Sequence, residues 1–230
     1  MTIQDISITG KSGHRDVATH PDNFVTNPTR LYGQMFKRIL DFMIVLLSLP
    51  IVLPIILVLA ILVATDGVNP FYAQRRVGKD GRIFTMWKLR SMVPNAHALL
   101  EAYLASNPAA RREWAETQKL KNDPRITTIG HVLRRTSLDE LPQLWNVLRG
   151  EMSLVGPRPM MPEQQELYPG KAYFSLRPGL TGSWQVSQRN MSTFASRAEF
   201  DTNYANNLTL RTDLGILYST IGVVFKATGY

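Results

Sequence analysis

The sequence has no cysteine among its 230 residues. Disulfide bonds and thiolate metal sites are therefore excluded, and a reducing compartment is permitted. The four histidines show no metal-ligand spacing, so we expect them to be structural or solvated. They are His14, His20, His97 and His131. A bound metal must then be held mainly by oxygen ligands, such as carboxylates.

Acidic residues are few relative to basic ones. The chain has 18 Asp and Glu against 26 Lys and Arg, which gives a net charge of +8 and a pI near 9.9. A basic protein favours anionic partners, and nucleic acid, phospholipid headgroups and phosphorylated substrates all satisfy this requirement. The length is sufficient for one globular domain with attachments, but not for two full domains.

Residues 1–33 lack a periodic apolar face and are rich in small polar residues, glycine and proline. This composition predicts a flexible N-terminal arm. A secretory signal is also excluded, because no basic region is followed directly by an apolar core here.

No charged residue occurs between Phe42 and Ala64, in the run FMIVLLSLPIVLPIILVLAILVA. The run exceeds the roughly 20 residues that a helix needs to cross a bilayer. A buried helix of a soluble protein is disfavoured, because such a helix seldom stays apolar on every face for six turns. We therefore predict a membrane helix over residues 34–66.

The flanks of this helix argue against a simple crossing. Lys37 and Arg38 precede it and several Lys and Arg residues follow it, so both ends favour the cytoplasmic side. Pro50 and Pro54 each remove a backbone donor, which predicts a bend. Ser48 is a candidate partner for the carbonyls that the bend frees. We expect a re-entrant helix, with an ordinary kinked span as the alternative.

The remaining residues, 67–230, predict one compact cytoplasmic domain. FYAQRR and RIFTMWK flank an Asp80-Gly81 turn signal, which indicates a β-hairpin. Asn107-Pro108 predicts a helix start, and Leu214–Phe225 predicts a short amphipathic or buried helix. Prolines and glycines between positions 156 and 182 exclude long elements there. No βαβ rhythm is present, so the fold class is α+β and mainly helical.

The densest chemical signal runs from position 134 to 159, as RRTSLDELPQLWNVLRGEMSLVGPRP. Ser137 and Glu140 fit a capping box, in which acids in a first helical turn are purely structural. The functional alternative is that Asp139 and Glu140 bind Mg²⁺ and that an aspartate attacks phosphorus.

Basic residues surround this acidic pair in the sequence and would hold phosphate oxygens. Arg134 and Arg158 belong to the same block, and prolines on either side of Arg158 restrict its backbone. RPGLTGSWQV places Arg177 before a rigid turn, and MWKLRSM places Lys88 just after the hairpin.

Three segments together, QRRVGKDGRIFTMWKLRSM, DPRITTIGHVLRRTSLDELPQLWNVLRGEMSLVGPRP and RPGLTGSWQV, resemble the bacterial sugar transferase family of monotopic phosphoglycosyl transferases. The short form resembles the rhizobial-type enzymes that initiate exopolysaccharide synthesis with galactose or glucose 1-phosphate. The resemblance runs from about position 37 to the C-terminus. It implies transfer of a sugar 1-phosphate from a UDP-sugar to undecaprenyl phosphate, with release of UMP.

The resemblance also implies roles for individual residues. Asp139 matches the nucleophile of a ping-pong reaction, Glu140 completes an acidic dyad, and Mg²⁺ assists. Residues that match phosphate-binding or substrate-side positions are Lys88, Arg134, Arg158, Arg189 and Asp201.

The family carries a re-entrant helix broken at a Ser-Pro pair, with amphipathic helices at the interface of the inner membrane. Here the corresponding pair is Leu53-Pro54. Family members can pair through the soluble face, which leaves a homodimer open.

A non-enzymatic membrane scaffold that binds lipid or nucleic acid is the alternative class. Nucleic acid is disfavoured, because the basic residues are not interleaved with exposed aromatics and because the acidic pair, without a metal, would repel a phosphate backbone.

Overall fold

The computed structural model describes residues 32–117, 120–187 and 193–225. The predicted flexible arm therefore lies almost entirely outside the described residues. Its last two positions begin a π-helical turn, Tyr32–Phe36, that leads directly into the first α-helix.

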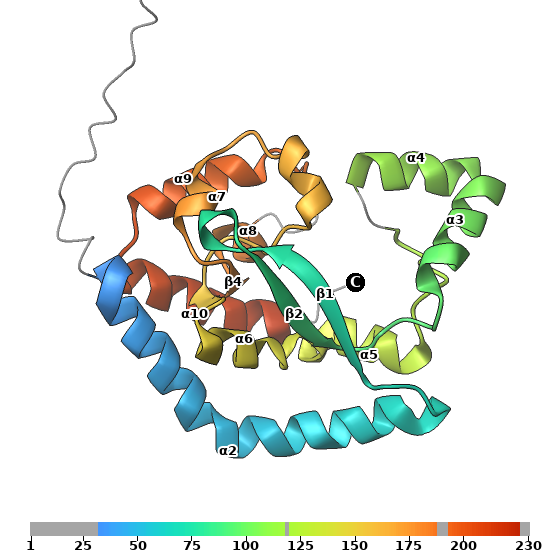
Figure 1. The fold of residues 1–230 in the computed structure, drawn as a ribbon, viewed down its shortest axis with the longest axis horizontal. Coiled ribbons are helices and arrows are strands. Elements are labelled where there is room, and N and C mark those ends of the chain that lie inside the picture. Colours follow the sequence, from blue (N-terminus) through green and yellow to red (C-terminus); the bar gives the residue numbers. More distant parts are fainter. Residues whose placement is uncertain (1–31, 118–119, 188–192, 226–230) are drawn as a thin grey trace, which may run out of the picture.

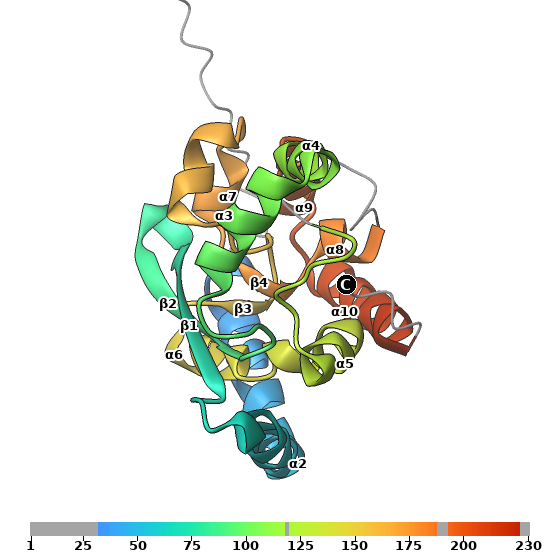
Figure 2. The ribbon, with the colours of Figure 1, turned by 90° about the vertical axis from the view of Figure 1, so that its right-hand side faces the viewer.

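Helix α2, Lys37–Val63, is followed by a 3-10 turn, Ala64–Asp66. It bends near its middle, and the other elements lie on the concave side of the bend (Figure 1). Turned by 90°, the second half of α2 lies along the edge of the molecule below α5 and α6 (Figure 2). Only 11% of its most apolar 18-residue window, of mean hydropathy 3.1, is buried. Because so much apolar surface is unfavourable in water, α2 associates the protein with a membrane.

The hydroxyl of Ser48 does not bond to either of the two carbonyls that Pro50 and Pro54 leave without an amide donor. Pro50 and Pro54 remove the amide donors that would reach the carbonyls of residues 46 and 50. Ser48 Oγ instead donates to the carbonyl of Val45 at 2.8 Å. The hydroxyl therefore supports the turn before the bend.

A buried polar cluster fixes the start of α2 to the C-terminal helices. Asp213 accepts hydrogen bonds from Lys37 Nζ at 2.6 Å, Tyr32 Oη at 2.7 Å and Tyr204 Oη at 2.5 Å. One turn further, Asp41 accepts from Ser153 Oγ at 2.6 Å. Since these groups come from three distant parts of the chain, the cluster sets the direction in which α2 leaves the domain.

The predicted β-hairpin is confirmed. Strand β1, Phe71–Val77, pairs antiparallel with β2, Ile83–Leu89, in a register that places Tyr72 opposite Lys88. Asp80 has φ 57° and Gly81 has φ 73°, the left-handed pair that a tight hairpin turn requires.

The helices after the hairpin include the one that the sequence predicts at position 108. Asn107 Oδ1 accepts from the amides of Ala109 and Ala110, both at 3.1 Å, and so caps this helix. The elements in this part of the chain are α3 (Ala96–Ser106), α4 (Pro108–Thr117), α5 (Thr128–Thr136), a 3-10 turn (Leu138–Glu140) and α6 (Gln143–Arg149).

The middle of the chain has short elements, as its prolines and glycines predict, but it also contains a parallel strand pair that the sequence did not indicate. A Cβ on Gly156 would overlap the carbonyl oxygen of Arg177 and lie 2.9 Å from the Gly179 amide, so only glycine permits this approach. The elements are β3 (Ser153–Val155), a 3-10 helix (Pro162–Leu167), α7 (Ala172–Ser175), β4 (Gly179–Thr181), α8 (Ser183–Ser187), α9 (Arg197–Asn206) and α10 (Leu210–Phe225).

One apolar core joins the membrane helix to the rest of the domain. Val45 of α2 packs in the same cluster as Met86 of β2, Val147 of α6 and Ile216 of α10. Helix α10 begins four residues before the predicted start. It buries Ile216 and leaves Leu214 and Tyr218 exposed, so it is amphipathic.

Candidate functional site

Asp139 and Glu140 lie in the single 3-10 turn between α5 and α6. Ser137, just before them, has φ 58° and ends α5, with its amide bonded to the carbonyls of Leu133 and Arg134. Its side chain makes no capping hydrogen bond. The capping-box interpretation is therefore wrong, because Ser137 precedes the 3-10 turn in the left-handed conformation and its side chain does not cap that turn.

Lys88 of β2 holds the acidic pair. Its Nζ donates to Glu140 Oε1 at 2.7 Å and lies 3.8 Å from Asp139 Oδ2. Asp139 is 6% exposed. Burial raises the pKa of Asp139 and the charge of Glu140 acts in the same direction, whereas the Lys88 ammonium opposes them.

Two predicted arginines complete this group. Arg158 Nη2 lies 3.5 Å from Glu140 Oε1. Arg134 donates from Nε to Ser91 Oγ at 2.8 Å. Its pKa is lowered by burial and raised in part by the negative charge of Asp139. The structure thus brings together five of the residues predicted for the site, Lys88, Arg134, Asp139, Glu140 and Arg158, from three separate segments.

Further cations that the sequence analysis did not single out extend the positive field. Burial lowers the pKa of Arg76 to about 10 and that of Arg197 to about 9, and Arg158 contributes to both shifts. Arg197 stacks on Trp184, with its guanidinium carbon 4.2 Å from the ring centroid, and on Phe194 at 4.6 Å. Arg76 lies in the QRRVGKDG segment that carries part of the family resemblance, whereas Arg197 lies in no segment quoted for it, so only the fold shows that both lie near Arg158.

Two other predicted substrate residues, Asp201 and Arg177, have their described contacts away from the acidic pair. Asp201 of α9 accepts from Tyr168 Oη at 2.8 Å, and burial raises the pKa of Asp201 to about 6. Arg177 Nε donates to the carbonyl of Gly150 at 3.0 Å, at the other end of α6 from Asp139. Arg189 lies outside the described residues.

A buried asparagine that the sequence analysis missed connects β2 to α6. Asn146 is fully buried. Its Nδ2 donates to the carbonyl of Thr85 at 2.7 Å and to Glu151 Oε2 at 2.6 Å, and its Oδ1 accepts from the Trp87 amide at 3.2 Å. The polar residue inside the apolar run LWNVL was the only available signal. Asn146 fixes β2, the strand that carries Lys88, against α6, the helix that follows the acidic pair.

The acidic pair suits a Mg²⁺ ion that is shared with a substrate. Within the described ranges no group of three or more His, Cys, Asp or Glu side chains is arranged to hold a metal. Mg²⁺ is commonly held by one or two carboxylates together with substrate phosphates. Asp139 and Glu140 therefore fit the ion only if phosphate oxygens complete its ligands.

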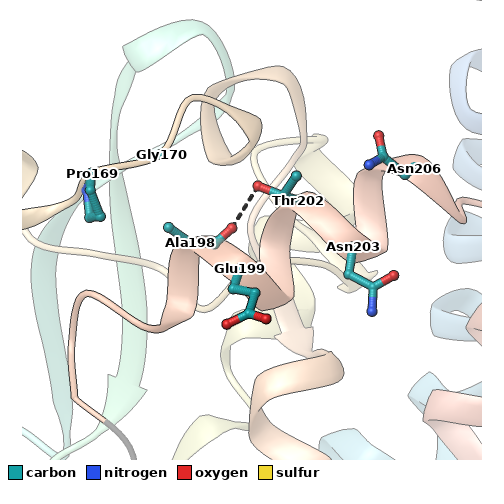
Figure 3. A pocket seen from close by; sticks show the side chains of 7 residues that line it. All are labelled: Pro169, Gly170, Ala198, Glu199, Thr202, Asn203 and Asn206. Atoms are coloured by element: carbon teal, nitrogen blue, oxygen red, sulfur yellow. Dashed lines mark hydrogen bonds between the residues drawn. The ribbon is translucent and has the colours of Figure 1, made fainter.

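Two hollows in the described part of the chain are large enough to consider as binding sites. One is a groove of about 530 Å³ between α9 and the Pro169-Gly170 loop, and its lining includes the polar residues Glu199, Thr202 and Asn203 (Figure 3). None of the predicted site residues lines it. The other, of about 330 Å³, lies between α2, the hairpin and the start of α6 and is almost wholly apolar.

Comparison with known proteins identifies the family. Residues 32–227 match the sequence profile of the bacterial sugar transferases. The chain belongs to the bacterial sugar transferase family. This transferase chain is 51% identical over 199 residues to a UDP-galactose-lipid carrier transferase of Erwinia amylovora, covering 86% of the chain and 42% of the relative.

Two further relatives differ in length. The exopolysaccharide production protein ExoY of Rhizobium meliloti (strain 1021) is 45% identical over 89% of this chain and 92% of its own length. An undecaprenyl-phosphate galactose phosphotransferase of Salmonella typhimurium is 44% identical over 88% of this chain and 43% of its own length. The chain thus spans less than half of the longer relatives and nearly all of ExoY.

Proposed function

We propose that this sugar transferase moves a sugar 1-phosphate, galactose or glucose, from a UDP-sugar to undecaprenyl phosphate, as the first membrane step of exopolysaccharide synthesis. The observation that carries the proposal is a buried carboxylate, Asp139, placed beside three cations that can bind phosphate. The names of the relatives supply the two substrates.

The reaction has two steps. A carboxylate oxygen of Asp139 attacks the phosphorus that bears the sugar, the bond from that phosphorus to the bridging oxygen breaks, and UMP leaves with the electron pair. A phosphate oxygen of the lipid then attacks the same phosphorus, and the Asp139 carboxylate leaves. Because UMP leaves before the lipid attacks the phosphosugar on Asp139, the kinetics are ping-pong.

The cations lower the energy of both transition states. Lys88 and Arg158 lie where they can hold the anionic oxygens, and Arg134 faces Asp139 from α5. Because these groups are already positioned by the hairpin and by Ser91, little reorganisation is needed when charge develops.

Asp139 and Glu140 would hold Mg²⁺ together with the diphosphate of the donor. When bound, the ion would offset the negative charge of the diphosphate oxygens.

The membrane arrangement follows from α2. Its bend, its apolar exposed surface and the cations at both ends support a helix that enters and leaves the cytoplasmic leaflet of the inner membrane. The exposed apolar residues of α10 suit a position at the interface. In this arrangement the acidic pair lies beside the bilayer and within reach of a lipid phosphate.

The test compares Asp139→Asn with Asp80→Asn, an exposed aspartate in the hairpin turn where asparagine also tolerates the left-handed conformation. Membranes receive UDP-galactose or UDP-glucose, Mg²⁺ and undecaprenyl phosphate, and release of UMP is measured. We expect loss of turnover for Asp139→Asn and unchanged turnover for Asp80→Asn. Retained turnover in Asp139→Asn would show that Asp139 is not the nucleophile. Mass spectrometry of the lipid product identifies the sugar.

A further inference from the structure

The apolar pocket lies on the concave side of the α2 bend. Leu49, Val52, Leu53 and Ile56 of α2 form one wall, Phe71 and Trp87 of the hairpin form another, and residues 141–148 close it. Leu53 is 55% exposed, so the pocket opens onto the same apolar surface that α2 presents to the membrane. With α2 in a membrane, a lipid tail can therefore enter the pocket directly from the bilayer.

The inner end of this pocket adjoins the acidic pair. Leu141 and Pro142 line the pocket and directly follow Asp139 and Glu140 in the chain. Consecutive Cα atoms are about 3.8 Å apart, so the pocket wall begins within one residue of the charged group.

The hairpin strand separates two environments at the same point. Side chains alternate along a strand, so Trp87 faces the pocket while the next residue, Lys88, contacts Glu140. A molecule that lies across β2 at this point would contact apolar walls on one side and three cations on the other.

We infer that this pocket binds the first isoprene units of the polyprenyl phosphate acceptor and so directs its phosphate toward Asp139. The inference rests on the proposed function and adds a lipid-tail subsite to it. The occupant needs an apolar tail that enters from the bilayer and an anionic head at the cations, which is the chemistry of this acceptor. A pocket of about 330 Å³ is too small for a whole 55-carbon chain, so the rest of the tail stays in the bilayer.

The benefit of such a pocket is orientation. A lipid tail is already in an apolar medium, so its transfer into the pocket gains little hydrophobic free energy. Holding the tail beside Leu141 instead raises the local concentration of the phosphate at the site. Occlusion of the pocket is therefore expected to impair the second step and to spare the first.

The experiment uses a matched pair on α2. Leu53→Trp fills the pocket, whereas Leu57→Trp, one turn later, changes a residue of similar exposure, 62%, that does not line it. In nanodiscs we expect Leu53→Trp to raise the KM for undecaprenyl phosphate about tenfold or more, while covalent labelling by the donor without acceptor is unchanged. Leu57→Trp should match the parent protein in both assays.

A second measurement does not depend on turnover. A polyprenyl phosphate that carries a diazirine in its first isoprene units should label residues 141–148 in the parent protein, and Leu53→Trp should reduce this labelling. Equal labelling of these residues by a diazirine phospholipid at the same concentration would mean that bulk lipid fills the pocket, which overturns the inference.

The two proposals fail in different ways. If the parent protein releases no UMP with either donor, the proposed function is wrong. If the parent turns over normally and Leu53→Trp has an unchanged acceptor KM, the proposed function stands and the tail subsite is wrong.

Discussion

Substitution of Asn146 by leucine tests how the site is held together. The residue is fully buried and makes three hydrogen bonds, to the carbonyl of Thr85, to Glu151 and from the Trp87 amide. Leucine has the same branched shape and the same number of side-chain heavy atoms, so the main loss is polar. Each bond contributes about 1 kcal/mol net, and a buried group left without a partner costs about 1–3 kcal/mol. We expect a loss of roughly 3–5 kcal/mol.

Thermal unfolding in detergent or nanodiscs measures this loss. For a domain of this size each kcal/mol lowers Tm by about 2–4 °C, so Asn146→Leu should lower Tm by roughly 10 °C. The control is Asn206→Leu, an exposed asparagine near the end of α9, which should leave Tm within about 2 °C.

Activity is the second readout for the same variant. Lys88 follows Trp87 directly on β2, so freeing this strand from α6 moves the ammonium relative to the acidic pair. Covalent labelling by the donor should slow about tenfold or more at a temperature where the variant is folded. Unchanged Tm together with unchanged labelling would refute the reasoning.

Substitutions at three other residues probe separate parts of the structure. Lys88→Met should lower the rate of UMP release about 10²–10³-fold because it removes a cation from the transition state, and Lys88→Arg should recover part of that loss; equal activity of Lys88→Met and the parent would contradict the assignment. Arg177→Met should lower the unfolding free energy by about 1–2 kcal/mol and leave the donor KM unchanged, since Arg177 bonds to the carbonyl of Gly150 at the end of α6. A raised donor KM would show that Arg177 contacts the substrate. Burial raises the pKa of Asp201 to about 6, above an ordinary value of about 3.9, so the folded state binds the Asp201 proton more tightly than the unfolded state does. The stabilisation that this proton contributes is complete below about pH 4 and is lost as pH rises through 6. Asp201→Asn should therefore gain stability relative to the parent by up to about 3 kcal/mol between pH 4 and 7.5 in urea unfolding, and a constant difference across that range would contradict the account.

Local patterns in the sequence predicted the elements that local chemistry determines. The apolar run gave the membrane helix, Asp80-Gly81 gave the hairpin turn, and Asn107-Pro108 gave a helix start. Each of these depends on neighbours within a few residues. The predicted contact partner of Ser48 was not found, because its hydroxyl bonds to the turn before the prolines.

Features that depend on distant contacts could not be predicted in this way. The parallel pair of β3 and β4 depends on the close approach of Gly156 and Gly179, whose need for glycine is set by tertiary packing. Ser137 appeared to be a helix start because its own sequence suits one, but α5 continues up to it and ends there.

The site shows the same division. Asp139, Glu140 and their cations were predicted from the dense block and the family resemblance. Arg76, Asn146 and Arg197 were missed, because each acts through groups that are far away in the chain. Arg177 was assigned to substrate from its turn, whereas its position is set by the end of α6.

The central claim is that Asp139 becomes covalently bound to the phosphosugar. The most direct measurement incubates the protein with a UDP-sugar labelled in the β-phosphate, without lipid acceptor, followed by acid quench, digestion and mass spectrometry. A modified peptide that contains Asp139, and that loses its label when undecaprenyl phosphate is added before the quench, is the predicted result. Active protein that never yields a labelled peptide containing residues 138–141 would contradict the account.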